Sequence, residues 1–559
     1  RLLPAYEPGR HELNVRFELA AEPESAPQPT TVKLWLADST GRVIGQTIVD
    51  GEGPQPVRLA LDAGAELWSP EQPHCHRLRV ELWQGEQLVD QRQMTVGLRE
   101  FKTTPTGFLL NDEPVVLRAA SVVWHRWTRD PESGELAFDT AWFERNIIAR
   151  LKAYGANTLR FHLGMPPEAL LDLCDRHGLL VQAEWIFFHG LNASEASMVE
   201  QWRAWLDLCV RHPSTAIIHG WNETSTEELK VAWAALDRLL PEYPPLVVGH
   251  RDVIHLHKYW WSLFENLGLY YDSAEQFSLP IMADEFGGNY LDGEGNPGGY
   301  PTLQESFLRF LGPNSTPQER LAFQALANGK VAEYWRRIGA AGFSPFCALG
   351  PPEDGNHWFQ GPLADAQEKP VWSALAAAWA PRSVSLELWD RNFRSGQSLQ
   401  ADVICFNDTP TAAQLELGVT VRDQRTGEPI GPAGLHRLTV APHRRARVPV
   451  DLKLPDRDGD WQVRVELLAG TVSERAIRSE WGIRTWSPSW SGPLSSAVIG
   501  VPVTEKELRR FFDHQGLRVV GIGDPAATVL VTGRFTANLL EAAQELPDDV
   551  VRALRTGKP

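Results

Sequence analysis

The stretch Arg211-His-Pro-Ser-Thr-Ala-Ile-Ile-His-Gly-Trp-Asn-Glu223 combines a turn, a short apolar run and an abrupt polar end. Because a buried parallel strand reads as a short apolar run between turn signals, we expect a strand over 216–220. An Asn-Glu pair at the end of such a strand has no role in packing, and barrel enzymes place their chemistry at that end. The alternative is that Glu223 is a solvated residue that opens the next helix, with Thr224 and Ser225 as caps.

On both sides of this stretch, apolar strands alternate with amphipathic helices, which is typical of a parallel α/β sheet. The pattern predicts strands over 115–120, 157–161, 179–183, 216–220, 246–248, 253–256, 281–283 and 343–348. It predicts helices over 143–151, 168–177, 199–210, 227–240, 318–338 and 371–379. Eight such units within about 280 residues match a (β/α)8 TIM barrel, which we assign to residues 98–381.

The segments that flank the barrel alternate apolar and polar residues with a period of two. Residues 1–97 and 382–487 therefore read as two immunoglobulin-like β-sandwiches. Residues 108–118 predict a hairpin that closes the barrel floor and leads into its first strand. Residues 488–559 read as the start of a doubly wound α/β domain with a helix over 505–514. Too few strands remain there to bury a sheet on both faces, so we expect this domain to be truncated.

Composition excludes some classes of partner. The chain has 559 residues, too many for one core, and a formal net charge of -17. This charge disfavours binding to nucleic acid or to anionic membranes. No apolar run is long enough to insert into a bilayer. The five cysteines are scattered without metal-ligand spacing and are expected to be buried and free. The 22 tryptophans fit either sugar-stacking platforms or core packing.

A second acidic strand end occurs in Pro280-Ile-Met-Ala-Asp-Glu-Phe-Gly-Gly288. Cleavage of a glycosidic bond with retention needs two carboxyl groups about 5–5.5 Å apart. Glu223 and Glu285 end different strands of the predicted barrel, and the same open face can bring them together. The glycines after Glu285 allow a sharp turn beside a ligand. The alternative for Asp284-Glu285 is an ordinary acidic loop.

Together these motifs resemble glycoside hydrolase family 2, the group of β-galactosidases, β-glucuronidases and β-mannosidases. The resemblance extends over roughly residues 1–485 and includes the order of sandwich, barrel and second sandwich. The motifs that carry it, in register along the chain, are Leu67-Trp-Ser-Pro-Glu71, Gly97-Leu-Arg-Glu-Phe101, Asn157-Thr-Leu-Arg160, Leu173-Cys-Asp-Arg-His-Gly-Leu-Leu-Val181, Arg211-His-Pro-Ser214, Asn222-Glu223, His257-Lys-Tyr259 and Asp284-Glu-Phe-Gly287.

The resemblance implies that Glu223 is the general acid/base and Glu285 the nucleophile. The acid should then hold its proton at neutral pH, in a less polar or like-charged neighbourhood. The nucleophile should stay ionised, and we expect hydrogen bonds to it from Arg160 and Tyr259. Asn222 would hold the sugar 2-OH. The alternatives are a barrel-floor ion pair for Arg160 and core packing for Tyr259.

Further residues at strand ends are candidates for the sugar subsite. His257 stands where the family has Asn, and Glu184 ends the third predicted strand. His125 is a subsite candidate with a structural histidine as the alternative. Trp358, after the eighth strand, is a candidate stacking floor. His162 lies one place before the family's histidine, so its role is not carried over.

The resemblance implies a retaining, exo-acting β-glycosidase that hydrolyses terminal β-linked sugars of oligo- or polysaccharides, with β-galactosidase-like activity favoured over β-mannosidase or β-glucuronidase. No convincing Asn-x-Lys of the kind expected for glucuronidases follows the nucleophile segment, which slightly favours neutral sugars. The alternative from another class is a non-catalytic carbohydrate-binding relative. We expect a carbohydrate substrate and no cofactor or catalytic metal. A homo-oligomer is left open, and a periplasmic or extracellular location is favoured.

Three departures from the family weaken the prediction of which sugar is bound. Ala119 replaces the usual Gly of the first strand, and Trp221 stands where Gly commonly precedes Asn222. The sugar-binding sandwich expected before residues 1–97 does not occur, so we expect a truncated N-terminus. That domain often lends residues to the pocket.

Overall fold

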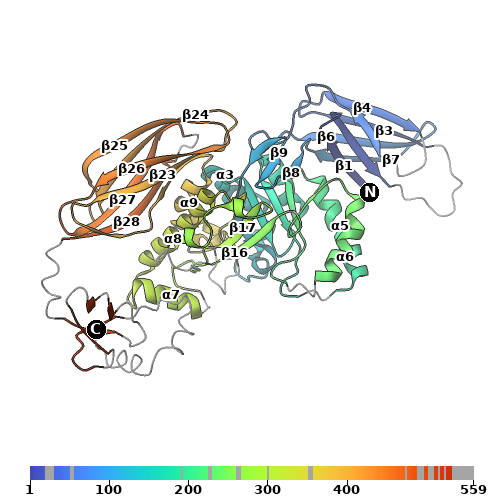
Figure 1. Cartoon of the computed structure of the whole chain (residues 1–559). Coiled ribbons are helices and arrows are strands. Elements are labelled where there is room, and N and C mark those ends of the chain that lie inside the picture. The colour runs from blue at the N-terminus through green and yellow to red at the C-terminus, as the bar shows by residue number, and fades with distance from the viewer. Residues whose placement is uncertain are drawn as a thin grey trace.

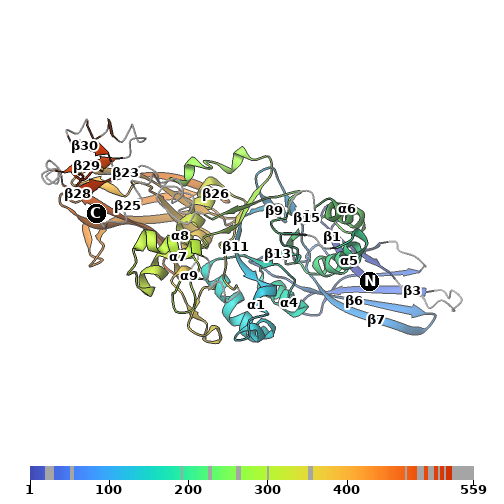
Figure 2. The same cartoon turned by 90° about the horizontal axis from the view of Figure 1, so that it is seen from below.

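The structure is a computed structural model that describes residues 1–18, 30–50, 56–190, 193–224, 229–259, 266–298, 301–350, 357–471, 475–487, 497–501, 509–510, 512–513, 517–521 and 524–531. A mixed α/β body lies between two antiparallel β units, which gives the molecule an elongated outline (Figures 1 and 2). Within the described residues, no helix is long and apolar enough to cross a bilayer.

The N-terminal unit consists of two antiparallel sheets in the orders β1-β2-β5 and β4-β3-β6-β7. Its strands are β1 (Leu2–Glu7), β2 (Glu12–Phe17), β3 (Thr30–Ala37), β4 (Val43–Asp50), β5 (Val57–Ala60), β6 (His76–Gln84) and β7 (Gln87–Val96). Alternate residues point inward, and both sheets contribute to one core that contains Leu13, Leu34 and Leu78. The unit is therefore a sandwich, whereas its immunoglobulin-like topology stays a prediction.

The central body contains eight parallel strands in the order β15-β14-β13-β12-β11-β18-β17-β16. They are β11 (Leu117–Val123), β12 (Thr158–His162), β13 (Leu180–Glu184), β14 (Thr215–His219), β15 (Val247–Val248), β16 (Ile254–Lys258), β17 (Ile281–Phe286) and β18 (Gly342–Phe343). An isolated bridge between Gly249 and Val253 joins the two edge strands. The predicted parallel α/β sheet is therefore correct, and the sheet curves into a barrel-like form.

Helices cover the outside of this sheet (Figure 1). They are α2 (Thr140–Phe143), η2 (Glu144–Ile148) and α3 (Ala149–Tyr154) in one continuous run, then α4 (Glu168–His177), α5 (Glu195–Arg211), α6 (Leu229–Leu239), α7 (Pro301–Leu311), α8 (Pro317–Ile338) and α9 (Val371–Trp379). A tight turn over 249–253 connects β15 to β16 without a helix, in agreement with the predicted strands over 246–248 and 253–256.

The base of the barrel is closed by the predicted hairpin. Strands β8 (Phe101–Thr103), β9 (Phe108–Leu110) and β10 (Glu113–Val115) pair in succession. Phe101 and Phe108 stack and pack with Leu117 and Met282 from two barrel strands. The hairpin thus removes apolar ends of the barrel strands from water.

Several of the quoted motifs meet where the N-terminal sandwich joins the barrel. Trp68 donates a hydrogen bond of 2.8 Å from Nε1 to the carbonyl of Asp175 at the end of α4. The Asp175 carboxylate accepts from His212 Nδ1 at 2.6 Å and from the Ser214 amide at 3.0 Å. Gly97 lies so close to Pro213 that an added Cβ would be 2.5 Å from the proline ring. These motifs therefore fix the turn that leads into β14.

The C-terminal unit has two sheets, β21-β23-β26 and β22-β28-β27-β24-β25. Its strands are β21 (Arg382–Glu387), β22 (Asn392–Arg394), β23 (Ser398–Asn407), β24 (Ala413–Asp423), β25 (Pro429–Val440), β26 (Arg444–Lys453), β27 (Gly459–Ala469) and β28 (Arg478–Trp486). Asp408 ties this unit to the barrel by ion pairs with Arg118 at 2.9 Å and Arg336 at 2.7 Å.

The tail contains a small parallel sheet in the order β30-β29-β31. Its strands are β29 (Val498–Val501), β30 (Arg518–Gly521) and β31 (Val529–Leu530). Parallel pairing agrees with the predicted doubly wound beginning. Most of the predicted helix over 505–514 lies outside the described residues.

Candidate active site

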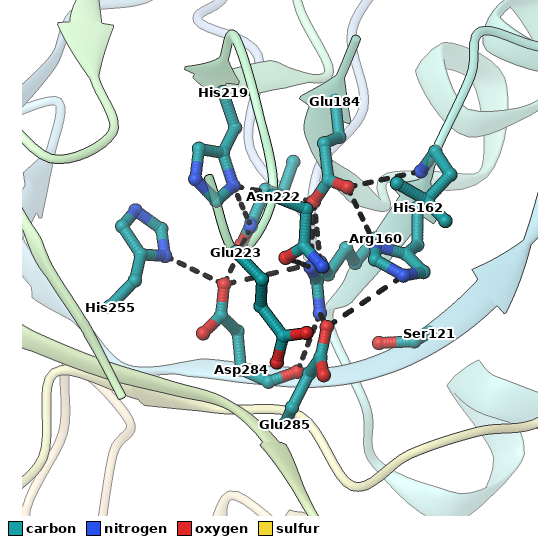
Figure 3. Close-up of polar contacts among 12 residues, drawn as sticks. Ser121, Arg160, His162, Glu184, His219, Asn222, Glu223, His255, Asp284 and Glu285 are labelled. Atoms are coloured by element: carbon teal, nitrogen blue, oxygen red, sulfur yellow. Dashed lines mark hydrogen bonds and ion pairs between the residues drawn. The ribbon is translucent and has the colours of Figure 1, made fainter. Parts of the chain in front are cut away.

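Polar and charged side chains gather at the carboxyl ends of the barrel strands. Arg160 and His162 end β12, Glu184 ends β13, and Asp284 and Glu285 lie near the end of β17. Glu223 follows β14 and reaches the same place (Figure 3). Strand ends of a parallel barrel converge on one face, which explains why residues so distant in sequence meet here.

The two predicted catalytic carboxylates lie together. Oxygen atoms of Glu223 and Glu285, with a ring nitrogen of His257, all fall within 4.8 Å of one another. Figure 3 shows the two carboxylates side by side. The Glu223 side chain is 35% exposed, whereas that of Glu285 is 5% exposed. One carboxylate therefore faces the solvent side of the site and the other lies at its base.

Glu285 is held by the two residues that were expected to bind it. Nη1 of Arg160 donates to Oε1 at 2.9 Å, and the Tyr259 hydroxyl donates to Oε2 at 2.7 Å. Burial and the charge of Glu285 raise the pKa of Tyr259 well above its usual range, so the phenol remains a donor. His162 Nε2 is 3.7 Å from Oε1. Both oxygens of Glu285 are thus held by donors from elsewhere in the barrel.

Glu223 differs from expectation in its electrostatics. Its backbone has a φ of 44°, in the left-handed region that a side chain disfavours and that clusters at functional sites. His257 Nδ1 lies 2.7 Å from Oε1, and His189 Nε2 lies 3.6 Å from Oε2. The hydrogen bond from His257 lowers the pKa of Glu223. The expected like-charged neighbour is present, since an oxygen of Glu285 lies within 4.8 Å. The expectation of a less polar neighbourhood is wrong, because two histidines flank this carboxylate.

Arg160 and Glu184 form a buried support beneath the carboxylate pair. Arg160 Nε and Nη2 donate to Oε2 of Glu184 at 3.0 and 2.7 Å, and Nη2 also reaches Asn222 Oδ1 at 3.1 Å. The other Glu184 oxygen accepts from the Leu163 amide at 3.1 Å and pairs with His162 Nδ1 at 2.6 Å. Both Glu184 oxygens are thus engaged, and its side chain is fully buried.

These contacts correct one predicted role and sharpen another. Glu184 cannot contact a sugar as predicted, because it has no exposed surface and binds protein groups with both oxygens. Arg160 is equally buried, so it acts on Glu285 rather than on a ligand. Arg160 therefore has both of the roles that the sequence left open: it forms an ion pair within the barrel with Glu184, and it holds Glu285. Asn222 is 1% exposed, and its contact with a sugar hydroxyl stays a prediction.

A second group of buried residues surrounds Asp284. His255 Nδ1 donates to Oδ2 at 2.6 Å and Gln182 Nε2 donates to the same oxygen at 3.0 Å. His219 stacks on His255 with ring centroids 4.2 Å apart. Burial favours the neutral acid, but the charges of His255 and Arg160 outweigh it and hold the pKa of Asp284 well below its usual range.

Of the remaining candidates, Trp358 is the one that the structure does not support. Its side chain is 1% exposed and packs against Trp372 and Trp379, with ring centroids 5.4 and 6.0 Å away. This tryptophan cluster beneath α9 leaves no ring face for a sugar. His125 is half-buried beside Gly164, and burial lowers its pKa. Its place in the sugar subsite stays a prediction.

A sequence profile described as Glycosyl hydrolases family 2 matches residues 14–99. A provisionally named β-glucuronidase from Formosa agariphila is 30% identical over 207 residues, which are 34% of this chain and 19% of that protein. The β-galactosidase BoGH2A of Bacteroides ovatus is 28% identical over 178 residues, 31% of this chain and 20% of that protein. Over these stretches the chain is similar to glycoside hydrolase family 2. It spans about a fifth of the length of these relatives.

Solved structures agree with this family at the level of the fold. The β-D-mannosidase of Dictyoglomus thermophilum superposes with a TM-score of 0.62 at 16% identity, and the match covers 87% of this chain and 67% of that one. The sequence matches, and not this likeness of fold, confirm the resemblance to family 2 drawn from the motifs.

The sequence did not predict several residues of this site, namely Gln182, His189, His219 and His255, and it placed Asp284 only as a neighbour of the nucleophile. A signal for one of them was present, because His255 stands two places before the predicted His257 on one strand and so shares its face. The sequence does not show which carboxylates these histidines contact. The pairing of β16 with β17 shifts register between His255 and His257, so that His257 stands opposite Glu285. Such a bulge re-aims side chains in a way that no pattern predicts.

Proposed function

We propose that this chain is a retaining, exo-acting β-glycosidase of family 2 that uses Glu285 as nucleophile and Glu223 as general acid/base. The observation that carries the proposal is the approach of the two carboxylates, whose oxygens lie within 4.8 Å. Retention is associated with carboxyl groups about 5–5.5 Å apart, whereas inversion needs about 6.5–9.5 Å to admit a water. The spacing therefore supports a double displacement.

In the first step, an ionised Glu285 oxygen bonds to the anomeric carbon as the bond to the leaving oxygen breaks and Glu223 delivers a proton to that oxygen. Arg160 and Tyr259 hold Glu285 at 2.9 and 2.7 Å and restrict its rotation. In the second step, a water attacks the anomeric carbon and gives its proton to Glu223, and Glu285 leaves as a carboxylate. Asn222, at the base of the site, is the group that we propose holds the sugar 2-OH.

For the sugar itself we propose a β-galactoside-like substrate. The relatives named β-galactosidases support this choice, and the Asn-x-Lys after the nucleophile segment, Asn328-Gly-Lys330, lies within α8, where Lys330 pairs with Glu333 at 2.8 Å. The β-glucuronidase and β-mannosidase names among the other matches make those two sugars the first alternatives. We further propose the division into sandwich (1–97), barrel (98–381), sandwich (382–487) and tail (488–559).

The test is hydrolysis of a panel of nitrophenyl β-galactoside, glucuronide, mannoside and glucosaminide by the whole chain. Glu223→Ala and Glu285→Ala would run beside it, with the exposed Glu428→Ala in the C-terminal sandwich as the matched control. We expect turnover on one sugar, lost by a factor of about a thousand or more in both site variants and kept in the control. Binding without hydrolysis across the panel would instead support a carbohydrate-binding protein. An inverted anomer in the first product would refute the double displacement.

A further inference from the structure

His257 has an unusual set of neighbours for a residue between two catalytic carboxylates. Its Nδ1 atom lies 2.7 Å from Oε1 of Glu223 and 3.3 Å from Oε2 of Glu285. Its Nε2 atom lies 3.4 Å from Oδ1 of Asp284. Both ring nitrogens of one imidazole thus face carboxylate oxygens. The side chain is 18% exposed, so little water screens these contacts.

This geometry fixes how many protons the pair carries. A neutral imidazole has one N–H donor and one acceptor nitrogen, and an acceptor would be repelled by a carboxylate. The Asp284 carboxylate, 3.4 Å away, therefore favours a proton on Nε2. A second proton must lie in the 2.7 Å contact, either on Nδ1 or on Oε1 of Glu223. In both arrangements, Glu223 and His257 together hold two protons.

The charges around His257 explain why the second proton is retained. The carboxylates of Glu223, Asp284 and Glu285 lie against the ring, and His250, from the turn before β16, interacts with it electrostatically. His189 and His162 lie beside Glu223 and Glu285. Three of these six groups are carboxylates. Burial opposes the charged ring, but the hydrogen bonds to Asp284 and Glu223 and the charge of Glu285 raise the pKa of His257 to about 10.

We propose that His257 is a positioning residue that stores the proton which Glu223 delivers to the leaving group. This inference rests on the proposed glycosidase function and adds the source of the proton. Such a store is needed because the hydrogen bond from His257 would otherwise keep Glu223 ionised and unable to act as an acid.

The transfer balances in charge as well as in protons. As Glu285 forms the glycosyl ester it loses its negative charge. The attraction that held the second proton on His257 therefore becomes weaker. That proton passes from Nδ1 to Oε1 of Glu223 while Glu223 gives a proton to the departing oxygen. The products are a neutral imidazole, an ionised Glu223 and a neutral ester. When water attacks the ester, its proton returns through Glu223 to Nδ1.

The first arm of the test compares leaving groups in His257→Asn, which installs the amide that the family motif carries. A dinitrophenyl glycoside departs without a proton, whereas a methyl glycoside needs one. We expect kcat/KM of the variant to fall about 100-fold for the methyl glycoside and less than about threefold for the dinitrophenyl glycoside. The acidic and basic limbs of the pH profile should move only with the first substrate. His436→Asn, on β25 of the C-terminal sandwich, is the matched control.

The second arm follows the imidazole itself in the whole chain with isotope-labelled histidine, using His257→Asn to assign its signal. We expect both ring nitrogens to be protonated at neutral pH in the parent, and titration to move to lower pH by about one unit or more in Glu223→Gln. Equal losses for both leaving groups, or a ring that titrates alike with and without Glu223, would overturn the proton store. Absence of turnover by the parent on every glycoside would instead overturn the proposed function, and the store with it.

Discussion

Nη1 of Arg160 lies 2.9 Å from Oε1 of Glu285, and the same guanidinium group holds Glu184 through Nε and Nη2. No part of the arginine side chain is exposed. A planar fork of five N–H donors can serve two carboxylates and a backbone carbonyl at once, which an ammonium group cannot. Arg160 therefore links the proposed nucleophile to the barrel core, so that catalysis and folding share one residue.

Arg160→Met should destabilise the barrel by about 3–5 kcal/mol, because it leaves Glu184 buried without its cation. Arg160→Lys should keep part of the stability and still lose most activity, because one ammonium group cannot hold both glutamates. Urea unfolding and turnover on the best glycoside would measure the two effects. Arg447→Met is the control, since Arg447 forms an ion pair with Asp402 and is 69% exposed. Its loss should cost at most about 1 kcal/mol.

Tyr259→Phe removes only the hydroxyl that donates to Oε2 of Glu285 at 2.7 Å. We expect kcat/KM to fall about 100- to 1,000-fold, comparable to removal of one donor from an oxyanion site, because Glu285 loses a hydrogen bond that orients it. Unfolding by urea should change little, since the ring stays in place. A variant that is unstable yet fully active would show that Tyr259 serves packing instead.

The positions of the catalytic pair could be predicted because parallel topology alone brings strand ends together. Glu223 and Glu285 needed no knowledge of packing to be placed on one face. The role of Glu184 could not be predicted from the sequence. The direction of its side chain depends on contacts with Arg160 and His162 from the neighbouring strand. The prediction that Trp358 stacks on a sugar was wrong for a similar reason.

Trp358 looked like a stacking residue because it follows the last strand, and the tryptophans that bury it lie in α9, further along the chain. The motifs at the sandwich junction show the same limit. Trp68 meets Asp175 across 107 positions, a contact that spacing within either motif does not reveal. Patterns along the chain report the face of an element, whereas partners across elements require the folded structure.

Gly287→Ala should destabilise the end of β17 and impair activity. Gly287 has a φ of +93°, and an added Cβ would lie 2.0 Å from Oδ1 of Asn328. Asn328 is buried and donates from Nδ2 to the Gln324 carbonyl at 2.9 Å, so it cannot easily move aside. We expect a loss of more than about 2 kcal/mol, together with a lower kcat, because Glu285 is only two residues away.

Gly361→Ala separates backbone strain from the steric clash. Gly361 has a φ of +62°, but an added Cβ would meet no atom within 4 Å. We expect a cost of only about 1–2 kcal/mol, the strain of a left-handed residue alone. Similar losses of stability in the two variants would contradict the clash with Asn328.

The buried pair of His212 and Asp175 predicts a pH dependence for the turn that leads into β14. Burial opposes the charged imidazole, but the 2.6 Å hydrogen bond and the charge of Asp175 outweigh it, so the pKa of His212 is raised. A folded-state pKa above the unfolded value of about 6.5 means that the protonated pair stabilises the fold fully below that pH. This contribution is lost as the pH rises through the folded pKa.

His212→Gln should therefore destabilise this region most in acid and progressively less in alkali. Amide exchange over residues 211–215, which include the Ser214 amide bonded to Asp175, would follow the effect locally. A difference between parent and variant that stays constant from acid to alkali would show that His212 acts through shape and not through charge.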